Sequence, residues 1–175
     1  IGQGRLQDAS KLLRTSVRLL ENANIAADSY LMADVRMRLG EALAAGQKFD
    51  EAMQQFDLAK RDMLQNDYVY ENYFARNPSL MLSLIRTGRA QEAAKRISEI
   101  YSKNLALFGA EHYLTGEALG FRGMVQVLQE NEQAALEDFS QALPILLAKS
   151  YSGTLSYDRQ IRRRIILESY LDLLV

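Results

Sequence analysis

The stretch LGFRGMVQVLQENEQAALEDFSQAL, residues 119–143, decides the fold of this chain. Gly123 precedes Ala135 by twelve positions, and Phe139 follows Ala135 by four. At 3.6 residues per turn, Ala135, Phe139 and the pair Ala142–Leu143 share one face of a helix. Because Gly123 and Ala135 are small, two antiparallel helices can approach closely there, and Phe139 fills the space beside them. The stretch therefore predicts a helical hairpin.

Small residues equivalent to Ala135 recur at near-equal intervals along the chain. They are Ala9, Ala52, Ala93 and Ala135, separated by 43, 41 and 42 residues. In the second unit, Gly40 takes the place of Gly123, and Phe56 takes that of Phe139. A single helical hairpin buries only one face and needs a neighbour to cover the other. The chain therefore reads as a row of helical hairpins.

The repeat divides the chain into units bounded by turns. The expected units are 1–24 (partial), 25–66, 67–108, 109–150 and 151–175 (partial). Gly4 is expected in the first turn, a long helix over 25–45, and Asp50 at the N-cap of the following helix. Because the first unit lacks its first helix, we expect a fragment of a longer protein.

The third unit is the least regular. Its residues 67–74 are rich in tyrosine, and Asn77-Pro78 follows. Either Asn77 caps a helix that starts at Pro78, or one helix runs from Tyr68 and kinks at Pro78. The aromatic residues either pack between repeats or form a platform for a peptide.

The C-terminal part ends the regular pattern. Pro144 is expected to kink or shorten its helix, and residues 150–154 to form a loop. Residues 158–175 predict an amphipathic helix that has no partner in the chain and exposes leucines. Because uncapped ends of helical repeats are adhesive, we expect either end-to-end association of copies or packing of this helix onto the fourth unit.

The composition narrows the class of protein. Of 175 residues, 48% are hydrophobic and 25% charged, which is typical of a folded chain rich in helix formers. The net charge of −1 gives no general attraction to nucleic acid or to a membrane surface. The absence of cysteine excludes disulfides and thiolate sites and fits a cytoplasmic location. No apolar run is long enough to span a membrane, and no signal peptide is visible.

No group of residues predicts catalysis, a cofactor or a metal. The single histidine, His112, is expected to cap or form a turn, and Glu137-Asp138 to be solvated. The run Arg162-Arg163-Arg164 could attract an acidic partner or nucleic acid, but its residues point in three directions on a helix. We expect a solvated helix face, with Arg164 able to pair with Glu168. The methionines are expected in the core; they are Met32, Met37, Met53, Met63, Met81 and Met124.

The opening stretch resembles a tetratricopeptide repeat. The matching positions are Leu119, Gly123, Ala135, Phe139 and Ala142–Leu143, whereas the turn at 130–132 departs from that family. The long period is similar to kinesin-light-chain-type arrays, whose inter-repeat turn resembles Gly109–His112, although Tyr113 replaces the expected proline. The resemblance implies an all-α, right-handed superhelix of helical hairpins. It also implies a non-enzymatic scaffold that binds a peptide or helix in its concave groove.

The repeat register assigns the side chains that face this groove. They are Asp34, Met37, Glu41, Ala44, Leu82, Ile85, Arg86, Glu117, Gly120, Met124, Val127, Arg159 and Arg162. Some members of the family clamp a peptide's terminal carboxylate with Asn, Lys and Arg. The equivalent positions here are Glu41, Leu82 and Met124, so we expect no such clamp. The predicted mechanism is apolar contact with a protein or peptide partner, supplemented by a few charge pairs.

A second resemblance covers residues 139–150 and 162–174. They look like the end of bacterial tetratricopeptide arrays that lead into a CHAT domain, a caspase-like peptidase. This resemblance implies that the chain is the sensor or scaffold arm of a larger peptidase whose catalytic domain follows Val175. The alternative is the partner- or ligand-sensing domain of a bacterial transcription regulator.

Overall fold

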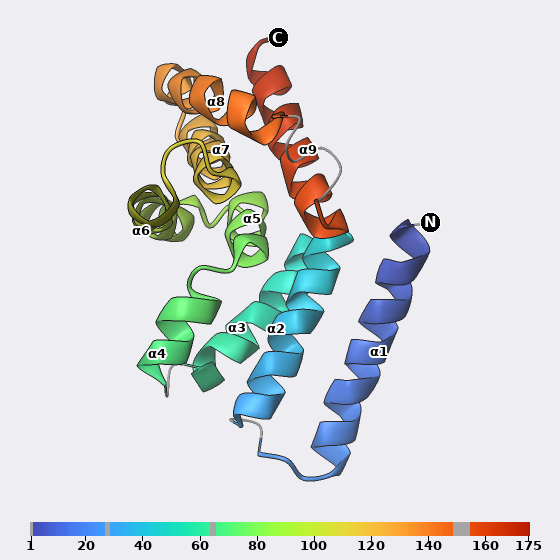
Figure 1. Cartoon of the computed structure of the whole chain (residues 1–175). Coiled ribbons are helices and arrows are strands. Elements are labelled where there is room, and N and C mark those ends of the chain that lie inside the picture. Colours follow the sequence, from blue (N-terminus) through green and yellow to red (C-terminus); the bar gives the residue numbers. More distant parts are fainter. Residues whose placement is uncertain (1, 27–28, 64–65, 149–154) are drawn as a thin grey trace. The chain divides into compact units, whose positions relative to one another are not determined.

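The computed structural model describes residues 2–26, 29–63, 66–148 and 155–175. Every regular element in these ranges is a helix (Figure 1). The predicted all-α class is therefore confirmed. The chain forms two compact units, Ile1–Thr87 and Gly88–Val175. The boundary falls in the turn that the repeat pattern places inside its third hairpin.

Unit 1 is built on one antiparallel helix pair. Its elements are α1 (Gly2–Asn22), α2 (Tyr30–Ala45), α3 (Phe49–Met63), α4 (Asp67–Val69), the π-helix η1 (Tyr70–Phe74) and α5 (Pro78–Arg86). α2 pairs with α3, α1 lies along α2, and α5 packs against both α2 and α3 (Figure 1). The two helices approach closely where Gly40 contacts Phe56, and a Cβ on the glycine would lie 2.8 Å from the ring. Only glycine permits this separation without a shift of the ring.

Unit 2 repeats the same arrangement. Its elements are α6 (Ala90–Phe108), α7 (Tyr113–Leu128), α8 (Glu132–Leu146) and α9 (Tyr157–Leu173). α7 pairs with α8, and a Cβ on Gly123 would lie 2.9 Å from the Phe139 ring. The predicted close approach at Gly123 is confirmed, and so is the role of Phe139 beside it.

The two hairpins are equivalent in sequence as well as in packing. Gly40 and Gly123 are 83 positions apart, and so are Phe56 and Phe139. Both phenylalanines are completely buried. Three of the four alanines that define the repeat, Ala52, Ala93 and Ala135, are likewise 0% exposed, whereas Ala9 is only half-buried. The glycine–phenylalanine contact therefore recurs in the second and fourth units of the predicted repeat.

Helix α5 begins where the first of the two alternatives for the third unit places it. The side chain of the N-cap residue Asn77 accepts hydrogen bonds from the backbone N–H groups of Ser79 (2.9 Å) and Leu80 (3.2 Å). Pro78 occupies the first turn, where its missing N–H costs nothing. Asn77 also donates from Nδ2 to Glu41 Oε1 on α2, at 2.6 Å. The cap therefore fixes α5 both along its axis and against α2.

Replacing Asn77 by alanine is expected to lower the free energy of unfolding by about 1–2 kcal/mol, because a buried cap is lost. Asn66→Ala is the matched control. Asn66 caps the three-residue α4 through Val69 (3.1 Å) but is exposed, so its loss should cost only about 0.5 kcal/mol. Urea unfolding followed by circular dichroism measures both. Equal effects of the two changes would contradict the special role of Asn77.

Three predicted element ends are wrong. Gly4 lies inside α1 rather than in a turn, because a helix tolerates glycine near its start, as at Gly2 and Gly4, at a cost of about 1 kcal/mol each. α2 begins at Tyr30 rather than at residue 25, since Ser29 supplies the N-cap and its hydroxyl accepts from Met32 N–H at 3.2 Å. Asp50 lies in the first turn of α3 and does not cap it.

The last helix has partners in the chain, contrary to one expectation. α9 packs against α7 and α8, and Ile165 and Ile166 are buried there (Figure 1). A Cβ on Gly120 of α7 would lie 2.7 Å from Ile166, so the absence of a side chain at Gly120 allows α9 to pack closely on α7. The alternative expectation, packing onto the fourth unit, is confirmed. α8 continues only two residues past Pro144, and the predicted loop at 150–154 lies outside the described residues.

Candidate binding surfaces

Three of the predicted groove residues form a partly exposed strip on α2. Asp34, Met37 and Glu41 follow at spacings of three and four and therefore share one helix face. We call them the α2 strip. Asp34 accepts from Arg38 Nε at 2.9 Å, which raises the pKa of that guanidinium through the hydrogen bond and the charge of Asp34. Glu41 accepts from Asn77, which leaves Met37 as the apolar centre of the strip. Ala44, on the same helix, is buried.

The groove residues assigned to α5 divide into core and surface. Leu82 and Ile85 are buried, whereas Arg86 is exposed. The Arg86 guanidinium carbon lies 5.8 Å from the centre of the Phe49 ring on α3, a cation–π contact. Arg86 is therefore the α5 residue with an accessible charged group.

Burial also separates the groove residues assigned to unit 2. Glu117, Gly120, Met124 and Arg162 are buried, while Val127 and Arg159 are half-exposed. The Arg159 guanidinium lies 5.6 Å from the centre of the Tyr113 ring. Of the predicted groove residues in unit 2, Val127 and Arg159 are therefore the ones that a partner could contact.

The buried charges of this set form an ion pair that joins α9 to α7. Arg162 Nε donates to Glu117 Oε1 at 2.9 Å, and its Nη1 donates to Asp158 Oδ2 at 2.8 Å. Arg162 is 5% exposed and Glu117 2%. Burial would lower the pKa of Arg162, but the charge and hydrogen bond of Glu117 raise it above its ordinary value. Burial would raise the pKa of Asp158, yet hydrogen bonds from Ser156 and Arg162 hold it below its ordinary value.

Tyr113, the first residue of α7, is buried in the same interface between α7 and α9. Its hydroxyl donates to the Arg159 carbonyl at 3.4 Å. Burial, reinforced by the negative charge of Glu117, raises the pKa of the phenol far above its ordinary value, so it stays neutral. The arginines 162–164 point in different directions, as predicted, but Arg162 is buried rather than part of a solvated helix face. Arg164 contacts Glu168 at 3.5 Å on the exposed side, as predicted.

The predicted solvation of Asp138 is wrong. Asp138 is buried, and Arg122 on α7 donates to it from Nε at 2.8 Å. The Arg122 guanidinium also lies 4.7 Å from the centre of the Tyr101 ring on α6. The hydrogen bond that Arg122 donates to Asp138 raises the pKa of the guanidinium against the opposing effect of burial. Arg122 thus ties α6, α7 and α8 together, while Glu137 stays exposed as predicted.

His112 has the capping role expected of it. It is the N-cap of α7, and its Nδ1 accepts from Leu114 N–H at 3.3 Å. Its ring stacks on Phe108, with centroids 4.6 Å apart. In the described ranges, no three His, Cys, Asp or Glu side chains are grouped so that they could hold a metal ion. None of the described helices is both long and apolar enough to cross a membrane.

The tyrosine-rich segment divides between the core and the surface, and its role as a platform for a peptide stays a prediction. Phe74 is buried, stacks on Tyr70 at 5.7 Å and meets Phe56 edge-on at 6.4 Å. Tyr68 and Tyr73 are exposed and contact each other edge-on at 6.3 Å. Five of the six methionines are buried as predicted, and Met37 is the exception.

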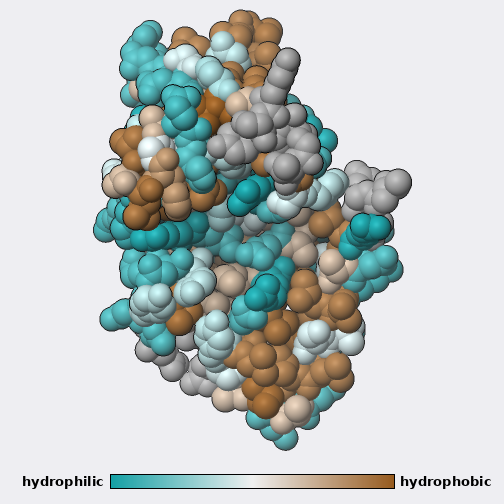
Figure 2. Space-filling view, viewed as in Figure 1, coloured by the Kyte–Doolittle hydropathy of each residue, from teal (hydrophilic) through white to brown (hydrophobic). Residues whose placement is uncertain are grey.

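Unit 1 also carries exposed apolar side chains on α1 and the start of α2. Leu12 is 68% exposed, Leu19 61%, Tyr30 61% and Leu31 51%. Figure 2 shows brown side chains gathered over the lower part of this unit, where the end of α1 and the start of α2 lie in Figure 1. The predicted adhesive character of the opening helix matches this exposure, and self-association through it stays a prediction.

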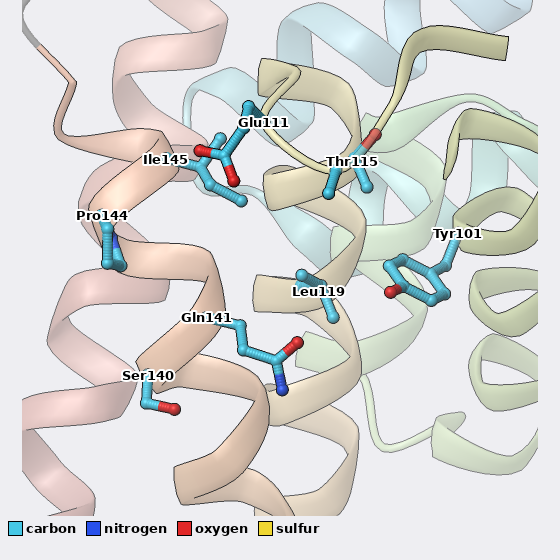
Figure 3. Close-up of a pocket in the computed structure, with 9 residues that line it drawn as sticks. Tyr101, Glu111, Thr115, Leu119, Ser140, Gln141, Pro144 and Ile145 are labelled. Atoms are coloured by element: carbon cyan, nitrogen blue, oxygen red, sulfur yellow. The ribbon is translucent and has the colours of Figure 1, made fainter. Parts of the chain in front are cut away.

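A pocket in unit 2 was not anticipated from the sequence. Its volume is about 240 Å3, and it is lined by Tyr101, Ala110, Glu111, Thr115, Leu119, Ser140, Gln141, Pro144 and Ile145. Thr115 and Ser140 use their hydroxyls internally, donating to the carbonyls of Gly109 and Glu137, each at 2.8 Å. Figure 3 shows Glu111 at one end above Ile145, and Gln141 reaching from α8 toward Leu119. The Tyr101 hydroxyl approaches Leu119 from the opposite side (Figure 3).

No protein-family model matches this sequence, and a search of the curated proteins finds no match. The resemblances to tetratricopeptide repeats and to CHAT-associated arrays therefore remain predictions drawn from the residues.

Proposed function

We propose that this chain is a non-catalytic protein-interaction module, a tetratricopeptide-like solenoid that takes a peptide or a partner helix on the faces of its first helices. The observation that carries the proposal is the recurrence of one glycine–phenylalanine hairpin contact after 83 positions, in α2–α3 and again in α7–α8. Repeated hairpins of this kind stack with a regular rotation, here taken to be right-handed, and present extended surfaces to partners. A cytoplasmic location is part of this proposal.

Within this proposal, the α2 strip is the best candidate for first contact. Met37 is an adaptable apolar side chain, and Asp34 and Glu41 lie one turn on either side of it. Asp34 accepts from Arg38, and Glu41 accepts from Asn77, so both carboxylates add negative charge beside Met37. The strip therefore favours a partner that offers an apolar side chain flanked by hydrogen-bond donors.

Replacing Met37 by glutamate is expected to weaken partner binding at least tenfold, because a third carboxylate is added to an acidic strip and the apolar contact is lost. Gln54→Glu is the matched control, since Gln54 is exposed on α3 and gains the same charge. Partners captured from lysate by the unmodified chain are identified, purified and titrated against each variant by calorimetry. Met124 is unsuitable for this test because it is buried, so Met124→Glu would damage the core.

The outcomes separate cleanly. Binding lost with Met37→Glu and kept with Gln54→Glu supports the strip. Equal binding by all three chains moves the site off α2, and a purified partner that binds none of them refutes the interaction module.

We propose further that the module serves as the sensor or scaffold arm of a larger bacterial CHAT-type peptidase. Support comes from the resemblance of residues 139–150 and 162–174. The alternative, a sensing domain of a bacterial transcription regulator, rests on the wider use of helical repeats in that role. The sequence of the parent protein decides between them. A Cys-His pair in a downstream α/β domain supports the first, and a helix-turn-helix DNA-binding segment supports the second.

A further inference from the structure

We propose that the pocket between the start of α7 and the end of α8 binds one positively charged side chain, of the lysine type, from a partner peptide. Its lining combines the carboxylate of the exposed residue Glu111 with apolar side chains and neutral polar groups, which is the chemistry of a cation site. The proposal concerns unit 2 and does not depend on the α2 strip.

The pocket is small. At about 240 Å3 it is smaller than the roughly 300–1,000 Å3 of pockets that hold whole drug-sized ligands. It therefore suits one amino-acid side chain rather than a cofactor or nucleotide.

The lining of the pocket carries a negative charge. Glu111 is the only charged residue of the lining, and among the described residues its carboxylate makes no hydrogen bond or ion pair. Half-buried Arg122, whose guanidinium lies over the Tyr101 ring, is paired with Asp138 at 2.8 Å. Among the described residues of the lining, the charge offered to a ligand is therefore that of Glu111.

The lining has both apolar and polar parts. Leu119, Pro144 and Ile145 form walls that can cover the four methylene groups of a lysine side chain. Gln141 and Tyr101 supply an amide and a hydroxyl beside Leu119 (Figure 3). In the described structure no hydrogen bond engages either group, so both remain available to a ligand's ammonium or to its peptide backbone.

The test is an NMR titration of the 15N-labelled chain with Nα-acetyl-lysine N-methylamide, and separately with the uncharged norleucine analogue. We expect saturable chemical-shift changes confined to the amides of residues 110–119 and 140–145, with a millimolar dissociation constant. The norleucine analogue should bind at least fivefold more weakly. Equal affinity for the two probes overturns the assignment to a cation, and changes spread elsewhere on the chain overturn the site.

Two variants with matched controls complete the test. Glu111→Gln should weaken lysine-probe binding at least fivefold without changing the norleucine result, whereas Glu99→Gln on the exposed side of α6 should leave both unchanged. Gln141→Lys should abolish lysine-probe binding by placing a like charge in the pocket, whereas Gln54→Lys should not. All four positions are exposed, so the variants should fold. Unchanged binding with both Glu111→Gln and Gln141→Lys refutes the proposal.

Discussion

Replacing Phe139 by alanine is expected to lower the free energy of unfolding of unit 2 by about 3–5 kcal/mol, the usual cost of deleting a buried aromatic ring. The ring is completely buried, lies against the bare backbone of Gly123 and meets Tyr170 of α9 edge-on at 5.7 Å. Because Gly123 has no side chain, it cannot move into the cavity. Urea unfolding gives the loss of stability, and hydrogen exchange should show the greatest loss of protection in α7 and α8.

Phe56→Ala tests whether the equivalence of the two hairpins is energetic as well as geometric. Phe56 is also completely buried and packs on Gly40, so we expect a loss of similar size, with the exchange effect in α2 and α3. Leu128→Ala is the control, because Leu128 is half-exposed at the end of α7 and should change stability by no more than about 0.5 kcal/mol. A Phe139→Ala chain within about 1 kcal/mol of the parent would show that the ring does not hold the hairpin together.

The hairpins were predictable because their determinants are short-range and steric. Gly123 and Phe139 lie on consecutive helices joined by a short turn, and their contact requires the two helices to pack closely. Gly40 and Phe56 repeat this contact. Ala52 and Ala135, which lie four positions before these phenylalanines, are completely buried as well. A pattern that recurs at a near-constant interval carries more information than any single helix signal.

Helix ends were less predictable because neighbouring caps compete. Ser29 stops α2 from extending back to residue 25, although the apolar pattern continues there. Asp50 has the right chemistry for a cap, but α3 already begins at Phe49. Pro78 marks a boundary in the sequence, but it permits either a cap at Asn77 or a kinked helix, and the structure has the cap.

The candidate sites depend on contacts between distant segments. A helix register can assign Glu117 and Arg162 to one face, but only the packing of α9 on α7 shows that they bind each other and are buried. The pocket draws its lining from α6, α7, α8 and the turn before α7, and no local motif marks such a combination. A carboxylate and an arginine at apolar positions of two helices, 45 positions apart, were the available signal for the ion pair.

Replacing Glu117 by leucine is expected to lower the free energy of unfolding by about 3–5 kcal/mol, because the change leaves the Arg162 guanidinium buried without its main counter-charge. In the part of the chain that the structure describes, Arg162 then retains Asp158 alone, whose side chain is 45% exposed and cannot replace a bond inside the interface. The double variant Glu117→Leu/Arg162→Met should return close to the parent stability or exceed it, since two buried charges become apolar contacts of similar size. Urea unfolding of the parent, both single variants and the double variant gives the coupling energy directly.

The control for this cycle is the exposed pair on the opposite side of α9. Arg164 and Glu168 lie 3.5 Å apart with more than half of each side chain exposed, so Glu168→Leu should cost no more than about 1 kcal/mol. The buried pair should also resist salt, because screening acts mainly on solvated charges. If the double variant were as unstable as Glu117→Leu alone, the loss would come from the packing of leucine rather than from an unpaired charge. Recovery in the double variant would instead show that the pair acts as one unit that attaches α9 to α7.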